Sequence, residues 1–190
     1  AGVADRLFEF AESLLHRVTG NLGYVNVFAS VGFAWMSGSA LADAAAMGKT
    51  LVPAMERSGF KKSFATGLTA SSSLISPVMP PSIPAVIYAS VAAVSTGALF
   101  AASVLPALLL AGSLLVVVAL YVSRHKEDLV GPAENPRPIG EATVRVLGAL
   151  LTPVIILGGI LGGFFTPTEA AALGALYIMI LGFIYRKLTI

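Results

Sequence analysis

The 190-residue chain contains no cysteine, and only 12% of its residues are charged. The absence of cysteine excludes a disulfide framework and a thiolate metal site. Soluble domains carry about a quarter charged residues, whereas residues 63–123 here contain no Asp, Glu, Lys or Arg. The mean hydropathy is +0.86. Together these features exclude a water-soluble fold and predict an all-α polytopic membrane protein.

The sequence also lacks the motifs of common enzyme classes. Its two histidines, His16 and His125, lie in an amphipathic segment and a charged loop, so neither can activate a serine within an apolar segment. There is no His-Glu-x-x-His zinc motif and no Gly-x-x-x-x-Gly-Lys-Ser/Thr phosphate-binding loop. We therefore expect neither enzymatic activity nor a bound cofactor, and any transport must draw on an ion gradient or a partner.

Residues 1–22 carry apolar side chains on one helical face and charged ones on the other. This pattern predicts an amphipathic helix that is too polar to span a bilayer. Such a helix lies at the membrane interface, with its apolar stripe against acyl chains or against other helices of the protein. The glycine-containing stretch 20–23 is expected to end it.

Residues 24–55 form two apolar runs separated by Ser37-Gly38-Ser39. A run of about 13 residues at ~1.5 Å per residue reaches roughly 20 Å, short of the ~30 Å hydrocarbon core. We therefore predict a re-entrant helical hairpin with the tripeptide at its tip. The alternative is one long span from residue 25 to about residue 46, kinked at the glycine.

Residues 63–94 are apolar but contain clustered Ser and Pro in their middle. Because each proline removes a backbone donor and clashes with the preceding turn, we expect two half-helices joined by irregular backbone around residues 76–84. Irregular backbone at membrane depth is tolerated only where it lines a cavity or is buried in protein.

The rest of the chain predicts a transmembrane helix over 97–123, a charged loop over 124–145 and two more transmembrane helices over 146–190. Cations cluster at the ends of these spans, which places all three clusters on the cytoplasmic side by the positive-inside rule. They are Arg57, Lys61 and Lys62; Arg124, Lys126, Arg137 and Arg145; and Arg186 and Lys187.

Two interrupted helices close in sequence suggest a binding site. Free amides at helix N-termini bind an anionic substrate, while unwound carbonyls and hydroxyls coordinate Na⁺. The structural alternative is that Ser and Gly serve close helix packing. Asp43 fits either an ion or proton site or the first turn of the helix that follows Ser39. Glu169 fits the start of a helix near the outer surface.

Three motifs resemble the large membrane subunit, DctM-like, of tripartite ATP-independent periplasmic (TRAP) transporters. They are Ala34 to Ala46, which contains the Ser-Gly-Ser tip; Ser76-Pro77-Val78-Met79-Pro80-Pro81-Ser82-Ile83-Pro84; and Gly158 to Ala172. They occur in the order found in that family, and the resemblance covers nearly the whole chain.

The resemblance implies an elevator-type, Na⁺-coupled importer with inverted repeats in the bacterial inner membrane. Its partners would be a small membrane subunit and a periplasmic binding protein that delivers a small organic anion. By this similarity residues 23–96 form half of the transport domain, residues 97–123 belong largely to the scaffold, and residues 146–190 begin a second repeat.

The same resemblance implies which residues form the sites. The implied substrate-binding residues are Ser37, Gly38, Ser39, Pro81 and Ser82, and the implied Na⁺ ligands are Ser37, Gly38 and Ser39 with Ser71, Ser72 and Ser73. Because the family has a second hairpin and a second broken helix, we expect the chain to be an internal fragment.

Two other functions remain open at this point. One is a divalent-anion/Na⁺ symporter that works without a binding protein. The other is a membrane scaffold that transports nothing, in which Gly and Ser only pack helices.

Overall fold

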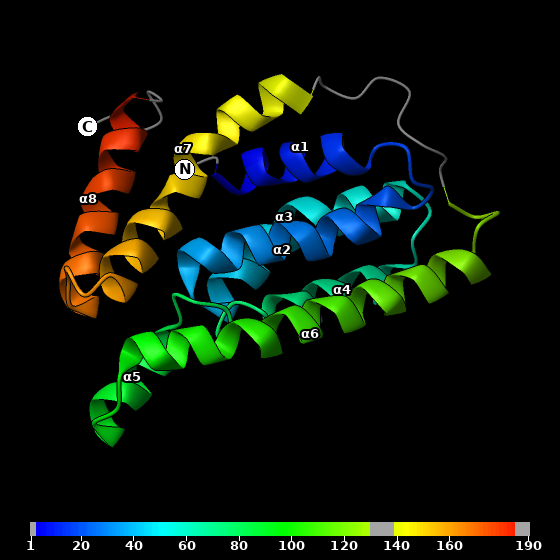
Figure 1. The fold of residues 1–190 in the computed structure, drawn as a ribbon. Coiled ribbons are helices and arrows are strands. Elements are labelled where there is room, and N and C mark those ends of the chain that lie inside the picture. Colours follow the sequence, from blue (N-terminus) through cyan, green and yellow to red (C-terminus); the bar gives the residue numbers. More distant parts are fainter. Residues whose placement is uncertain (1–2, 130–138, 185–190) are drawn as a thin grey trace.

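A computed structural model describes residues 3–129 and 139–184, and in these residues the chain forms helices and no strand. The all-α prediction is therefore confirmed for this part of the chain. The helices are α1 (Val3–Leu15), α2 (Asn21–Ser37), α3 (Ala40–Arg57), α4 (Lys62–Ser73), α5 (Ile83–Ala92), α6 (Thr96–Arg124), α7 (Ile139–Leu161) and α8 (Pro167–Ile184) (Figure 1).

Helix α1 is the predicted amphipathic helix, and its apolar face lies against protein. It packs on α2 and α7, and Leu7 and Ala11 on its inner face are buried. The turn after it comes earlier than expected, over residues 16–20. Gly20 adopts the left-handed conformation with φ +66°, and α2 begins at Asn21, so most of the stretch 20–23 is helical.

Helices α2 and α3 form a hairpin whose tip is Gly38-Ser39. Gly38 has φ +58°, and its N–H donates to the carbonyl of Ala34, which closes α2. Ser39 opens α3 by accepting a hydrogen bond from the N–H of Ala42 at 3.4 Å. The alternative of one continuous span through this region is therefore wrong. The helices contain 17 and 18 residues, longer than the apolar runs, because their outer turns include polar residues.

Helices α4 and α5 are the predicted half-helices, and irregular backbone joins them over residues 74–82. The break lies about two residues earlier than expected. Pro84 falls in the first turn of α5, where a missing N–H costs no helical hydrogen bond. Residues 71–73 form the last turn of α4 instead of belonging to the break.

Helix α6 matches the predicted span over 97–123. It packs on α2, α4 and α5, and its buried residues Ala107, Ala111 and Val118 join the core beside Met55 and Phe60. Among the described residues it alone is long and apolar enough to cross a membrane.

Helices α7 and α8 pack against each other at one side of the molecule (Figure 1). Within the described residues their apolar parts are Leu151–Leu161 and Pro167–Phe183, and only the first is shorter than the span predicted for it. Helix α7 starts at Ile139, so the last residues of the predicted 124–145 loop are helical. Of the predicted cation clusters, Arg137, Arg186 and Lys187 lie outside the described residues.

Candidate substrate and ion site

The tip of the hairpin contacts the break between α4 and α5. A Cβ atom on Gly38 would overlap the carbonyl oxygen of Pro81 and would lie 3.3 Å from the backbone nitrogen of Ile83. Only glycine permits this approach, and its positive φ adds a second reason for glycine here. The two helix interruptions that the sequence predicts separately therefore meet in space.

Two helices begin at this meeting point. Ser39 caps α3, and Ser82 caps α5 by accepting a hydrogen bond from the N–H of Ala85 at 3.2 Å. The first amides of a helix have no carbonyl partner within the helix and carry the positive end of its dipole. The region near Gly38 and Pro81 thus combines two helix N-termini with the hydroxyls of Ser39 and Ser82.

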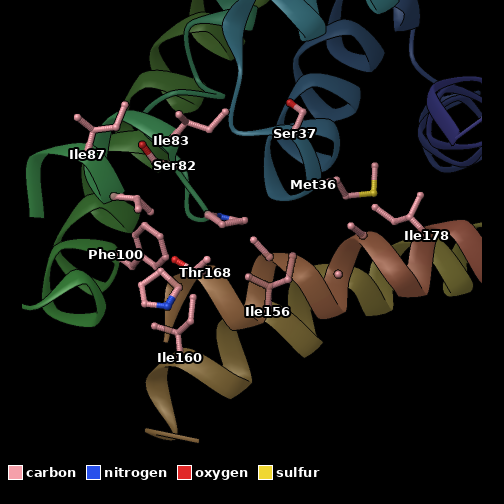
Figure 2. A pocket seen from close by; sticks show the side chains of 16 residues that line it. Met36, Ser37, Ser82, Ile83, Ile87, Phe100, Ile156, Ile160, Thr168 and Ile178 are labelled. Carbon is pink, nitrogen blue, oxygen red and sulfur yellow. The ribbon is translucent and has the colours of Figure 1, made fainter. Parts of the chain in front are cut away.

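A cavity of about 490 Å³ opens beside the tip. Figure 2 shows its walls, which come from the end of α2, the start of α5, the start of α6, and α7 with α8. The walls are mainly apolar, and no charged side chain is among the described residues that line them. Lining residues from these five helices include Met36, Ser37, Ser82, Phe100, Ile156 and Thr168.

A buried carboxylate lies behind the tip. Asp43, in the first turn of α3, is fully buried. Its Oδ2 accepts a hydrogen bond from the Ser76 hydroxyl at 2.8 Å, and its Oδ1 lies 3.4 Å from the Ser30 hydroxyl. Ser30 belongs to α2 and Ser76 to the break, so this carboxylate joins both hairpin helices to the broken helix.

Further polar groups extend the cluster along α4. The Ser30 hydroxyl lies 3.1 Å from that of Ser72, which donates to Asn26 Oδ1 at 2.8 Å. The Asn26 amide donates to the Thr69 hydroxyl at 2.7 Å, and that hydroxyl donates to the carbonyl of Ala65 at 2.9 Å. All four side chains are buried, so each depends on these bonds in place of water.

The residues implied by the family resemblance fall into three places. Ser37, Pro81 and Ser82 line the cavity, whereas Gly38 and Ser39 form the tip. Ser72 and Ser73 are buried in α4, and Ser71 beside them is half-buried. Among the described residues no hydrogen bond joins the tip to Ser71, Ser72 or Ser73.

The sequence analysis did not single out Asn26, Ser30, Thr69 or Ser76 as site residues. A signal for them is present. Asn26 and Ser30 are four residues apart on the otherwise apolar α2, so they share a face. Thr69, Ser72 and Ser76 have the spacing of one helical face, which continues from α4 into the turns that follow it.

Glu169 lies away from this cluster and acts at a helix start. Its Oε2 accepts hydrogen bonds from the N–H and the hydroxyl of Thr166, both at 2.8 Å. The Glu169 N–H in turn lies 3.4 Å from the Thr166 hydroxyl oxygen. This reciprocal pattern is a capping box, which stabilises the first turn of α8.

Comparison with known proteins identifies the family. The family model described as tripartite ATP-independent periplasmic transporter, DctM component, matches residues 1–190. The sialic acid TRAP transporter large permease protein SiaM of Vibrio cholerae is 44% identical over 191 residues, which are 100% of this chain and 44% of that protein. The C4-dicarboxylate TRAP transporter large permease protein DctM of Pseudomonas aeruginosa is 40% identical over 188 residues, 98% of this chain and 44% of that protein.

A third relative is the sialic acid TRAP transporter permease protein SiaT of Haemophilus influenzae. It is 38% identical over 190 residues, which are 100% of this chain and 31% of that protein. The chain thus spans less than half the length of these curated relatives, which are transporter permeases and not enzymes. The chain belongs to the DctM family, the large permease component of TRAP transporters.

Proposed function

We propose that the chain forms half of the substrate site of a Na⁺-coupled importer of small organic anions. The observation that carries this proposal is the contact of the hairpin tip with the helix break at Gly38 and Pro81, beside a cavity of about 490 Å³. A membrane protein gains nothing in stability from two interrupted helices at one place, because each interruption leaves backbone groups without helical partners.

The electrostatics of this region favour an anion. Two helix N-termini, at Ser39 and Ser82, are close to the cavity, and the lining residues that the structure describes contain no carboxylate. Amides and hydroxyls at helix N-termini stabilise negative charge without a basic side chain. The apolar remainder of the wall suits the carbon skeleton of an organic acid.

Oxygen groups at the tip and at the end of α4 support a Na⁺ site. Hydroxyls of Ser37 and Ser39 at the tip, with backbone oxygens of the Ser71, Ser72 and Ser73 turn, supply the hard ligands that alkali cations prefer. In this proposal Na⁺ binds between tip and turn and draws them together, since no direct hydrogen bond holds them in the described structure.

The packing supports movement of the hairpin and the broken helix together. Helix α3 packs extensively on α4, and α6 packs on α2, α4 and α5. Helices α2, α3, α4 and α6 therefore share one core, whereas α8 packs on α7, and α7 packs on α1. In this proposal an elevator mechanism moves the hairpin and the broken helix as a unit, and α6 moves with them instead of belonging to the scaffold as the family resemblance implies.

The partners and substrate follow from the family. A small membrane subunit and a periplasmic binding protein would work with the permease in the bacterial inner membrane. Relatives are named for sialic acid, C4-dicarboxylates and 2,3-diketo-L-gulonate. All three substrates are organic acids, so we assign this class and no single compound.

The test is uptake into proteoliposomes that contain the full permease with its small subunit. Radiolabelled sialic acid and succinate are offered with the binding protein present, under an inward Na⁺ gradient. We expect uptake of one of them that stops when an ionophore collapses the gradient. Uptake that ignores the gradient would contradict the coupling, and equal uptake without the binding protein would favour an independent symporter.

A further inference from the structure

The buried polar cluster behind the tip has one donor hydrogen fewer than it has hydrogen-bond contacts. It forms a linear chain of contacts from Asp43 Oδ1 through Ser30, Ser72, Asn26 and Thr69 to the carbonyl of Ala65. Both ends of this chain, the carboxylate oxygen and the carbonyl oxygen, are acceptors. The chain has five contacts, and its four inner side chains each donate one hydrogen along it.

This shortage does not depend on how the Asn26 amide is oriented. If the amide group is turned over, it donates towards Ser72 in place of Thr69. The contact that lacks a hydrogen then lies elsewhere in the chain, but one such contact remains. In either orientation one oxygen–oxygen contact between buried groups lacks a hydrogen. Such a contact is unfavourable at low dielectric.

No basic side chain in the described part of the chain neutralises Asp43, and the N-terminal dipole of α3 offsets its charge only in part. Its partners are the hydroxyls of Ser76 and Ser30 alone, and no Lys, Arg or His in the described part of the chain forms an ion pair with it. A fully buried carboxylate without a countercharge is costly. The titratable side chains described on the helices packed against α3 are those of Arg6, Glu9, Glu12, Tyr24 and Lys62, and none is a partner of Asp43.

One bound monovalent cation removes both deficits. We propose that Asp43 is an exchange site for a monovalent cation, either a proton or Na⁺, in addition to the ion site at the hairpin tip, with which it shares Ser72. A proton on Oδ1 donates to Ser30, so that Ser30 donates to Ser72 and every contact has a hydrogen. Alternatively Na⁺ binds to Asp43 Oδ1, Ser30 Oγ and Ser72 Oγ, whose neighbouring separations are 3.4 and 3.1 Å.

The position of Asp43 gives this site a role in transport. The carboxylate holds Ser76 of the break at 2.8 Å, on the segment that leads to Pro81 at the tip. Loss of the cation would leave the carboxylate charged and accepting from Ser30, so that the contact between Ser30 and Ser72 lacks a hydrogen, which would loosen α2 from α4. The inference rests on the proposed function, because it assigns a further ion to the same carrier.

The test is equilibrium binding of ²²Na⁺ to the purified full transporter with its small subunit, at about pH 6 and about pH 8.5, both above the ordinary pKa of an exposed aspartate. Asp43→Asn keeps the shape of the side chain and an oxygen acceptor for Ser76 but cannot carry the exchangeable charge. Ser113→Ala, which removes a hydroxyl of α6 outside the cluster, is the matched control.

Two results support the proposal and distinguish its two cations. If the site takes Na⁺, Asp43→Asn binds one Na⁺ fewer per complex than the wild type at the higher pH. If it takes a proton, both proteins bind the same number of Na⁺, but the pH dependence of uptake in the wild type is absent in Asp43→Asn. The proposal is overturned if Asp43→Asn matches the wild type in both the bound Na⁺ and the pH dependence.

Failure of the proposed function gives a different result. A wild type that binds no Na⁺ at either pH contradicts Na⁺ coupling, while the pH dependence of uptake still decides the role of Asp43. If Asp43→Asn does not assemble, Ser30→Ala replaces it. This variant removes the hydroxyl that contacts Oδ1, so the proposal requires a shift in Na⁺ affinity or pH dependence, and unchanged values overturn it.

Discussion

Gly38 lies so close to the carbonyl oxygen of Pro81 that a Cβ atom at this position would overlap it. Gly38→Ala therefore forces the tip and the break apart and also places an alanine at φ +58°. The left-handed conformation alone costs about 1–2 kcal/mol for a residue other than glycine. We expect uptake to fall at least about tenfold, measured as the initial rate in proteoliposomes, while the complex still assembles.

Gly48→Ala is the control for this variant. Gly48 lies in α3, and a Cβ there meets no atom within 4 Å, so alanine should stabilise the helix by up to about 1 kcal/mol and leave uptake unchanged. A Gly38→Ala protein that transports normally would contradict the site. One that fails to assemble would favour the scaffold interpretation, in which glycine only packs helices.

Gly59 makes a second close approach, but one that we expect to matter for stability. It has φ +90° in the connector between α3 and α4, and a Cβ would overlap the carbonyl oxygen of Asp128 after α6. Gly59→Ala should lower the free energy of unfolding by at least about 1–2 kcal/mol, seen as a lower thermal midpoint. The folded fraction should transport at the wild-type rate, and a selective loss of transport would contradict this assignment.

Aromatic rings hold the same connector against α6. The Phe60 ring stacks on those of Phe64 and Tyr121, with centroids 5.9 and 5.7 Å apart, and Phe60 is 3% exposed. Phe60→Ala should therefore cost about 3–5 kcal/mol. Tyr121→Phe keeps the ring and loses only the acceptor for the Lys61 N–H at 3.2 Å, which should cost about 1 kcal/mol. Chemical unfolding of both variants tests the ranking, and equal losses would refute it.

The hairpin tip and the helix break were predictable because local chemistry determines both. Gly38 ends α2 by adopting a positive φ, and the prolines between Ser76 and Ser82 prevent a continuous helix whatever surrounds them. The error of two residues at the break arose from Pro84, which disrupts a helix interior but is accepted in a first turn.

The partners of Asp43 were not predictable in the same way. Its contacts with Ser30 and Ser76 depend on how three helices pack together, and the sequence alone does not specify that packing. The face shared by Asn26 and Ser30 marks them as inward-facing polar residues, but a pattern on one helix does not identify the groups opposite. The Gly38 contact with Pro81 depends on tertiary packing for the same reason.

The variant Glu169→Gln tests whether Glu169 only caps α8 or also takes part in ion coupling. Glu169→Gln keeps the capping box with Thr166, because Gln serves as well as Glu at this position. We expect the Na⁺ concentration at half-maximal uptake to stay within about twofold of the wild-type value, a change of about 0.4 kcal/mol. A tenfold shift in that concentration would instead make Glu169 an ion ligand.

The central claim is that the anion and Na⁺ bind where the hairpin tip meets the broken helix. Because these 190 residues contain no cysteine, a cysteine placed at Ser37 in the cavity wall is the one thiol in this part of the permease, and a variant with cysteine at Ser113 is the control. The rate of modification by a small thiol reagent is then measured with and without the transported anion and Na⁺. The account predicts that both ligands together slow modification at residue 37 but not at residue 113, and equal rates at residue 37 under all conditions would contradict it.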